Sequence, residues 1–423
     1  MPGLVRPLED KWQDVLDAVL RKRGAPPIRD TAKLAPRLVE LSNAYNAQLA
    51  GDGAKARVPL DARIAFSFAR DVPKGAGAVA ALLTAGLLGR SGRTLRIVDL
   101  GAGLGAMTWG ITRALEAAGG AAEVPIEALL VDEDAEALAA AEVIAREAIL
   151  ALGTAAPPLT IQIRKERLAP GMSLPEADLV VLGQVLSELD VALEPTARAA
   201  KHAALVSDLL ARIVAPDGAL VIVEPALRDR TRHLHAVRDR LVADGTTVFA
   251  PCLHSLGCPV LATEGDWCHE DLPIDLPQWL VPLARAAGLR FQRVTFSHLV
   301  LRRDQHRLAD PQVRAQSATP APGRSRLHLR VISELMRTKG KAEVFACTEH
   351  GERLRLRRLD RDAAASGPHA AATAAWDGVR RGDVVTLTGD GGDGRDGSET
   401  AGPIDERGRI NAAAEIDVWR AGK

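Results

Sequence analysis

Aromatic residues are scarce in this sequence. Phe, Trp and Tyr together make up 3% of the 423 residues, and Tyr45 is the one tyrosine. A core with so few rings must be packed mainly by Leu, Val and Ala, and broad aromatic platforms for stacking nucleic-acid bases are not expected. Hydrophobic residues still reach 47%, which is ordinary for a folded chain and excludes general disorder.

Net charge is also lacking, because 54 basic residues balance 54 acidic ones. Bulk charge therefore predicts no nucleic-acid partner. Basic residues nevertheless gather in the last quarter of the chain, at 324–330, 337–341 and 353–361. Such runs either face phosphates or form a solvated surface, and the sequence leaves both readings open.

The first residues have no apolar core of the signal-peptide kind, and no uncharged apolar run approaches the ~20 residues that span a bilayer. We therefore expect a cytoplasmic protein with no membrane partner, and a monomer. The chain has four cysteines. In a reducing compartment, metal binding or chance explains them better than disulfides do.

The order of apolar runs predicts an α/β protein with several regions. Residues 1–90 read as helical. From 91 to 303, short apolar runs alternate with helical stretches, which indicates a doubly wound, Rossmann-like parallel sheet. The expected strands lie at 95–100, 126–131, 159–163, 179–182, 219–223 and 294–301, and the expected helices between them lie at 107–118, 135–152, 195–213 and 276–287.

Three further segments break this rhythm. Residues 250–275 form an aperiodic, cysteine-rich insertion that we expect after the fifth strand. A polar linker at 304–324 precedes a small β domain at 325–390, where apolar and polar residues alternate. Residues 391–423 are expected to form a flexible tail, with a Gly/Asp-rich, disordered stretch at 389–402.

A glycine loop follows the first expected strand, where residues 99–105 read D-L-G-A-G-L-G. Glycine is needed where a backbone turns tightly and a ligand approaches closely, and the following helix presents unpaired N–H groups. Residues 101–106 also fit the dinucleotide pattern G-x-G-x-x-G/A. The acidic residue before the loop and the third glycine favour the form seen in S-adenosylmethionine methyltransferases over that of a nicotinamide dehydrogenase.

An acidic residue ends the second strand, where it can accept hydrogen bonds from ribose hydroxyls. The carboxyl end of the fourth strand should line the same crevice. The predicted cofactor-binding residues are Asp99, Gly101, Ala102, Gly103, Gly105, Asp132 and Gln184. No Asn-Pro-Pro-Tyr motif follows the fourth strand. The methyl acceptor and any catalytic residue are therefore unassigned, although methyl transfer needs mainly in-line positioning.

The cysteines are Cys252, Cys258, Cys268 and Cys347. Three of them cluster among glycines and prolines, in a loop that needs another source of order. Four thiolates suit Zn²⁺ or an iron–sulfur cluster. Their spacing differs from the paired C-x₂-C of zinc ribbons, although His254 and His269 would be available to complete a zinc site.

Several motifs together resemble the mitochondrial small-ribosomal-subunit methyltransferase-like family, which comprises Rsm-type mitoribosomal assembly proteins and their bacterial relatives. They are D-L-G-A-G-L-G, V-L-S-E-L, V-I-V-E-P, A-P-C-L-H-S-L-G-C-P, D-W-C-H, F-S-H-L-V-L and a later cysteine. The resemblance implies a class I methyltransferase core, with Gly101, Gly103 and Gly105 holding S-adenosylmethionine. It also implies a [4Fe–4S] cluster on Cys252, Cys258, Cys268 and Cys347, and association with the small ribosomal subunit or its rRNA during assembly.

We therefore expect a methyltransferase-like protein of small-subunit assembly, stabilised by a structural four-cysteine cluster. Two alternatives remain at this point. One is a non-catalytic assembly or RNA-binding factor that keeps the cofactor fold. The other is a small-molecule methyltransferase with a zinc-bound accessory domain.

Overall fold

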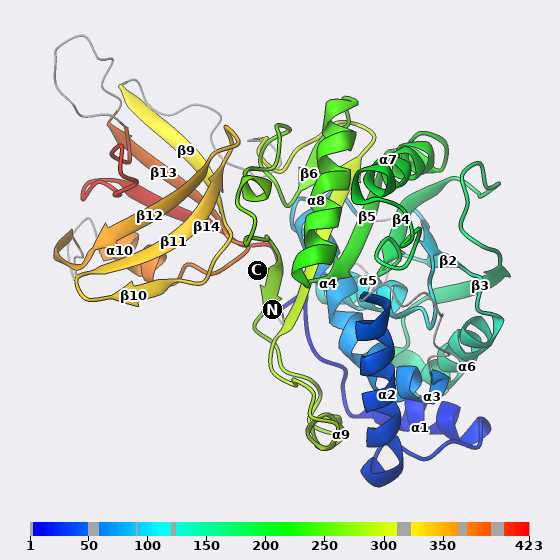
Figure 1. Ribbon diagram of the computed structural model, residues 1–423. Coiled ribbons are helices and arrows are strands. Elements are labelled where there is room, and N and C mark those ends of the chain that lie inside the picture. The colour runs from blue at the N-terminus through cyan, green and yellow to red at the C-terminus, as the bar shows by residue number, and fades with distance from the viewer. Residues whose placement is uncertain are drawn as a thin grey trace.

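The computed structural model describes residues 3–49, 59–89, 92–119, 124–310, 323–362, 370–390 and 402–422. An α/β part and a smaller antiparallel β part lie side by side (Figure 1). Among the helices in these ranges, none combines the length and apolarity needed to cross a bilayer.

The α/β part is built on one mixed sheet with the strand order β3-β2-β1-β4-β5-β8-β6, and β7 pairs with β8. The strands are β1 (Leu95–Leu100), β2 (Ile126–Asp132), β3 (Leu159–Lys165), β4 (Ala177–Gly183), β5 (Val214–Pro225), β6 (Val248–Ala250), β7 (Glu270–Leu272) and β8 (Val294–Arg302). The first five pair in parallel, whereas β8 runs antiparallel to β5 and β6. The predicted fold class, an α/β protein with a doubly wound, Rossmann-like sheet, is confirmed.

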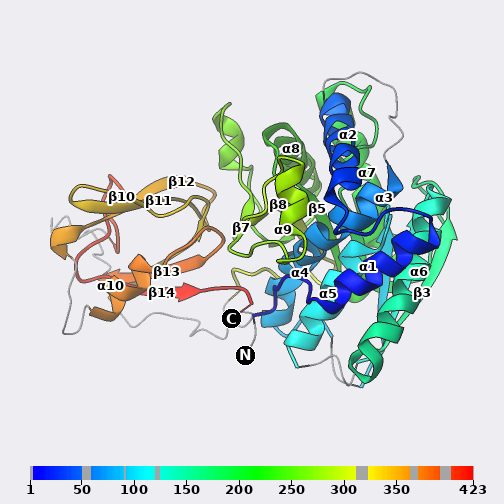
Figure 2. The same ribbon diagram turned by 90° about the horizontal axis from the view of Figure 1, so that it is seen from below.

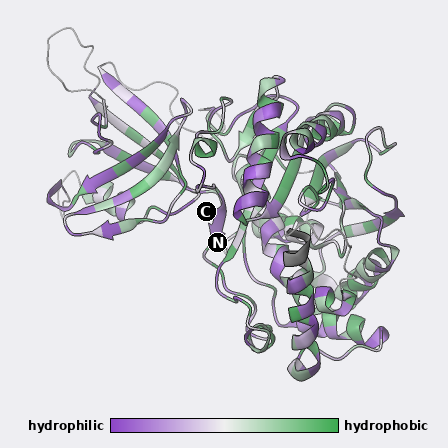
Figure 3. Ribbon diagram, viewed as in Figure 1, coloured by the Kyte–Doolittle hydropathy of each residue, from purple (hydrophilic) through white to green (hydrophobic). Residues whose placement is uncertain are grey.

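Helices cover both faces of this sheet because alternate strand residues point to opposite sides. Ile97 packs in a core with α4 (Phe68–Thr84) and α5 (Ala106–Ala117), whereas its neighbour Val98 packs with α7 (Pro195–Arg212) and α8 (Arg228–Ala243). Figure 3 shows the central strands as mainly hydrophobic and α8 as a mixture of both kinds of residue. The sheet is therefore buried on both sides.

The region before β1 is helical in the structure. It comprises α1 (Lys11–Lys22), α2 (Thr31–Leu49), α3 (Leu60–Ala62), a π-helical turn at Arg63–Ser67, and α4. Trp12 of α1 meets Trp109 of α5 edge to face, with ring centroids 4.8 Å apart. Further along the chain, α6 (Ala135–Leu152) lies against α1, and α9 (Val281–Ala286) lies near α2 (Figure 2). These helices build one wall over the carboxyl ends of the strands.

The cysteine-rich insertion comes after the fifth strand, and two elements that the sequence did not reveal, α8 and β6, lie between β5 and the cysteines. The apolar stripe of α8 consists of Leu234, Val237 and Leu241, and it is interrupted by the buried Thr231 and Arg238. These polar residues hid the helical period in the sequence.

The smaller part is a curved antiparallel sheet with the order β10-β11-β9-β13-β14, in which β12 pairs with β11. Its elements are β9 (Arg324–Val331), β10 (Met336–Thr338), β11 (Lys341–Thr348), β12 (Arg353–Leu359), α10 (Ala370–Asp377), β13 (Val384–Asp390) and β14 (Glu415–Trp419). Its core is closed by Trp376, which is 1% exposed. The structure corrects the expected tail, because residues 415–419 pair with β13 as a strand. The expected disordered stretch lies largely outside the described residues.

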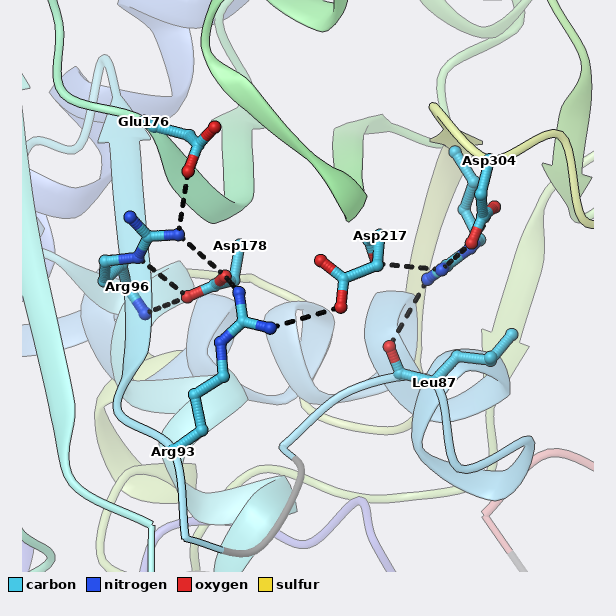
Figure 4. A network of polar contacts seen from close by, with 8 residues as sticks. Leu87, Arg93, Arg96, Glu176, Asp178, Asp217 and Asp304 are labelled. Atoms are coloured by element: carbon cyan, nitrogen blue, oxygen red, sulfur yellow. Dashed lines mark hydrogen bonds and ion pairs between the residues drawn. The ribbon is translucent and has the colours of Figure 1, made fainter.

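A polar network lies where β1 and β4 begin (Figure 4). Asp178 accepts hydrogen bonds from the Arg96 backbone N–H at 2.9 Å and from the Arg96 side chain, and it also pairs with Arg93. Arg93 extends to Asp217 at 3.2 Å, and the buried Arg302 donates to the Asp217 carbonyl at 2.8 Å. The network ties the amino-terminal edge of the sheet together.

Candidate functional site

The glycine loop turns tightly between β1 and α5. Gly101, Gly103 and Gly105 have φ values of 68°, 53° and 76°, in the left-handed region that side chains disfavour. The Gly101 N–H donates to the Val131 carbonyl of β2 at 2.8 Å, which anchors the loop to the neighbouring strand. The glycines are therefore required by the backbone itself.

Asp132, at the end of β2, holds this loop in place. Its Oδ2 accepts from the Gly103 N–H at 2.8 Å, and its Oδ1 accepts from the Asp134 N–H at 2.8 Å. Each carboxylate oxygen has a second lone pair, so further donors can still bind. Sequence reasoning placed Asp132 beside the loop, and the structure adds that its carboxylate is bonded directly to it.

Asp99 is fully buried at the end of β1. Burial raises its pKa to about 7, although the Thr108 hydroxyl donates to Oδ2 at 2.8 Å and favours the charged form. Among the described residues, Oδ1 has no hydrogen-bond partner. A buried acceptor of this kind usually has a function, because leaving it unpaired costs free energy.

A cleft of about 1730 Å³ opens at the carboxyl ends of the strands. The strand order reverses between β1 and β4, which is where ligands bind in open α/β sheets. Six of the seven predicted cofactor residues line this cleft: Asp99, Gly101, Ala102, Gly103, Asp132 and Gln184. Gly105 is absent from the lining and precedes the first residue of α5 instead.

An ion pair from α4 faces the same cleft, and sequence reasoning missed it. Lys74 Nζ lies 2.7 Å from Asp71 Oδ1, and the Gln184 side-chain amide donates to Asp71 Oδ2 at 2.9 Å. Burial lowers the pKa of Lys74, whereas Asp71 favours its charged form. The available signal was a single lysine within a run of apolar and small residues at 72–82.

Glu224 explains why two motifs of the sequence occur together. This carboxyl group is 1% exposed at the end of β5, and burial raises its pKa to about 7. It accepts hydrogen bonds from the backbone N–H groups of Leu186 at 2.8 Å and Ser187 at 3.2 Å. The glutamate of V-I-V-E-P therefore fixes the loop of V-L-S-E-L beside the cleft.

Arg63, on the π-helical turn, crosses over the glycine loop. Its Nη1 lies 2.9 Å from Asp134 Oδ2, and a Cβ added to Gly103 would lie 2.7 Å from its Nη2. The N-terminal helices thus supply Arg63, Asp71 and Lys74 to a cleft whose floor comes from the sheet. Sequence reasoning treated these helices as a separate region and assigned no site residue to them.

The cysteines come together although they lie far apart in the sequence. Cys252, Cys258 and Cys268 line a small cavity between α8 and β8. Cys347 lies on β11 of the second sheet, and its thiol interacts electrostatically with the other three. Burial, assisted by the neighbouring thiols, raises the pKa of Cys258 and of Cys268 to about 12 and also raises that of Cys347.

Two arginines lie near the cysteines. Arg238 is 2% exposed and donates to the His254 carbonyl at 2.8 Å, while Arg330 pairs with Glu270. Both guanidinium groups lie close enough to act electrostatically on the thiols. Within the described ranges, no group of three or more His, Cys, Asp or Glu side chains has the geometry of a metal site. The structure thus brings the four cysteines near one another. Which group they bind is taken up below as a proposal.

Comparison with known families decides the relationship. Residues 91–377, more than half of the chain, match the family described as mitochondrial small ribosomal subunit Rsm22. This chain belongs to the Rsm22 family. The resemblance inferred from the motifs is confirmed. No curated protein matches the chain.

Solved structures with a similar arrangement include several methyltransferases. A protein of Listeria monocytogenes described as a class I S-adenosylmethionine-dependent methyltransferase is 15% identical, and the match covers 72% of this chain and 95% of that one, with a TM-score of 0.35. The plantazolicin methyltransferase BpumL in complex with SAH is 9% identical, with coverages of 65% and 98% and a TM-score of 0.32. Precorrin-6y C5,15-methyltransferase of Geobacter metallireducens is 14% identical, with coverages of 52% and 84% and a TM-score of 0.28.

Proposed function

We propose that this Rsm22-family protein binds S-adenosylmethionine in the cleft beside β1 and works, as a methyltransferase-like protein, with the small ribosomal subunit. The observation that carries the proposal is the glycine loop fixed by Asp132 at the point where the strand order reverses. The family description names the small ribosomal subunit, which supports the choice of partner.

The charges of the cleft suit such a cofactor. Asp132 keeps lone pairs for ribose hydroxyls, and the glycines let a ligand approach the loop backbone without a Cβ in the way. Lys74 and Asp71 place a cation and an anion side by side, which complements the carboxylate and ammonium of an amino-acid group. When bound, S-adenosylmethionine supplies an activated methyl group, and the protein's part is to orient it and exclude water.

A calorimetric titration with S-adenosylmethionine tests the cleft. Gly103→Ala adds a methyl group that meets Arg63 and strains the loop, so we expect affinity to fall about tenfold or more, equivalent to ~1.4 kcal/mol. Gly24→Ala is the matched control, because Gly24 also has a positive φ, of +68°, but a Cβ there would meet no atom within 4 Å. Both variants carry similar backbone strain of ~1–2 kcal/mol.

Equal affinity of the wild type and Gly103→Ala would contradict the assignment of the loop. Tighter binding of NAD than of S-adenosylmethionine would favour a dehydrogenase cleft instead.

We further propose that Cys252, Cys258, Cys268 and Cys347 hold a [4Fe–4S] cluster that joins the insertion to the second sheet. The donor set suits it, because four sulfur ligands without a paired C-x₂-C spacing fit a cluster better than a zinc ribbon. Arg238 and Arg330 support the proposal, since their positive charges would offset the negative charges of four thiolates.

Metal analysis after anaerobic purification tests the cluster. We expect about four iron and four sulfide per chain. Cys268→Ser should lower the iron content and thermal stability together, since one ligand is lost. Ser255→Ala, in the same loop, is the control and should retain iron. Stoichiometric zinc in a colourless protein would contradict the cluster, and unchanged iron in Cys268→Ser would contradict the ligand assignment.

A further inference from the structure

The second sheet closes into a barrel. Strands β9, β11 and β12 form a meander, α10 follows, and β13 and β14 return along β9. The Arg357 N–H of β12 donates to the Gly408 carbonyl at 2.9 Å, and the Ile410 N–H donates to the Arg357 carbonyl at 2.9 Å. A Cβ on Gly408 would lie 2.3 Å from the Arg355 carbonyl, so this close approach requires glycine.

This connectivity matches a five-stranded, partly open barrel, an architecture that in other proteins binds oligonucleotides across its second and third strands. The corresponding strands here are β11 and β12. Fold alone does not establish a function, so the surface must be judged by its side chains.

The two faces of β11 and β12 differ sharply in chemistry. The inner residues Val344, Ala346 and Leu356 are fully buried in the barrel core. Alternate residues point outward, because side chains of a strand alternate between its faces. The outward set on the paired strands is Lys341, Glu343, Phe345, Arg353, Arg355 and Arg357, and Cys347 ends the same face of β11 beside the other cysteines. We call this set the outer basic face.

One ring and several guanidinium groups organise the outer basic face. The Arg353 guanidinium lies 4.2 Å from the Phe345 ring centroid, and that of Arg355 lies 5.9 Å from it. The Arg355 side chain is 56% exposed and pairs with Glu343 at 2.9 Å. Glu343 is buried and also pairs with Lys341 at 2.9 Å. Its single charge is thus shared between two cations, and Arg353 pairs with Asp266 of the insertion, so the four cations of this face meet two carboxylates.

The hairpin between β10 and β11 adds further cations, of which Arg337 pairs with Asp377 at 2.8 Å. It reads Arg-Thr-Lys-Gly-Lys at 337–341, and residues 337–340 are exposed. The Asp360 N–H, just after β12, donates to the Gly340 carbonyl at 2.9 Å, so the hairpin lies against the end of that strand. Figure 1 shows β10, β11 and β12 as neighbours, with β10 at the end of the barrel farthest from the α/β part.

We propose that the outer basic face, together with the 337–341 hairpin, binds single-stranded RNA. Lysine and arginine contact phosphates, whereas an aromatic ring offers one stacking position for a base. Bases in a duplex are stacked on each other, so only a base of an unpaired strand has a free face to stack on a ring such as Phe345. The choice of RNA rests on the proposed association with the small ribosomal subunit.

The scarcity of aromatic residues fits this arrangement. The chain has six phenylalanines, and the outer basic face carries one ring, Phe345. A broad stacking platform is therefore absent from this face, and affinity would come mainly from phosphates. Strong salt dependence is the expected consequence.

Fluorescence anisotropy with the full chain tests this surface. The probe is a labelled single-stranded RNA of about 12 nucleotides and mixed sequence, within the range that one such barrel occupies. Removing two cations with Arg355→Ala/Arg357→Ala should weaken binding about tenfold and reduce the slope of log affinity against log salt by ~1.4. Phe345→Leu keeps an apolar side chain but removes stacking, so binding should weaken about fivefold or more.

The matched control is Arg21→Ala/Arg146→Ala, which removes two exposed arginines from α1 and α6. Weaker RNA binding by Arg355→Ala/Arg357→Ala (the barrel variant), with normal binding by the control, supports the outer basic face as the RNA-binding surface. Equal binding by the two double variants, equal binding of a duplex of the same length, or no binding by the wild type overturns it. Titration of the barrel variant with S-adenosylmethionine separates this proposal from that of the cleft, because cofactor affinity is measured independently of RNA binding.

Discussion

Asp99 and Glu224 are buried carboxyl groups that sit beside the cleft, at the ends of β1 and β5. Burial raises the pKa of each to about 7. In the unfolded chain both groups ionise near pH 4. Between these values the folded state holds protons that the unfolded state has lost, so the contribution of these two groups to the free energy of unfolding is greatest below about pH 4 and decreases as the pH rises to about 7.

Asp99→Asn tests this linkage. Asparagine cannot ionise, so the decrease in unfolding free energy between pH 5 and 7 should become shallower by about 1 kcal/mol per pH unit. Urea unfolding at several pH values measures the slope. Asp229→Asn, an exposed position on α8, serves as the control. A slope in Asp99→Asn as steep as that of the wild type would show that Asp99 is already ionised in the folded state.

At the residue scale, the sequence was informative where the backbone itself restricts the residue type. The left-handed turns at Gly101 and Gly103 allow little else, so the loop was readable. Asp71 and Lys74 were not readable, because a charged pair on a helix is ordinarily solvent-exposed. Their importance comes from the packing of α4 over the sheet, which no local pattern encodes.

At the scale of elements, the strands of the first sheet were predicted to within a few residues, except β5 and the missed β6 and β7. Strands such as β1 and β4 are buried on both faces, and this produces short continuous apolar runs. β5 is longer than expected because its first residues, which include Pro216 and Asp217, interrupt the apolar run.

Two of the missed elements, α8 and β14, were hidden for different reasons. The helix α8 buries Arg238 and Thr231, so its apolar stripe is incomplete. Strand β14 alternates as E-I-D-V-W but follows a Gly/Asp-rich stretch that dominates the local composition. Pairing with β13, a contact between distant residues, makes it a strand.

At the scale of the whole molecule, the two parts are joined at several points. Arg353 pairs with Asp266 at 2.5 Å, and Val384 of β13 packs into the core of the α/β part. The Gly422 N–H donates to the Thr84 hydroxyl at 2.9 Å, which brings the end of the chain back to α4 (Figure 1). The cysteine cluster lies within this contact region.

The convergence of Cys347 with Cys252, Cys258 and Cys268 could not be derived from spacing alone. It depends on how the barrel docks against the insertion, and the motif resemblance supplied the grouping that local patterns lacked. The structure in turn places the candidate cleft, the cysteines and the outer basic face on one chain.

The most direct test of this account is sedimentation of the purified chain with small ribosomal subunits in the presence of methyl-labelled S-adenosylmethionine. We predict that the protein travels with the small subunit and leaves the large subunit unbound. Label transferred to the particle would mark a methyltransferase, and binding without transfer would mark an assembly factor that keeps the cofactor fold. A protein that stays unbound in the presence of both subunits, whatever its affinity for the cofactor, would contradict the account.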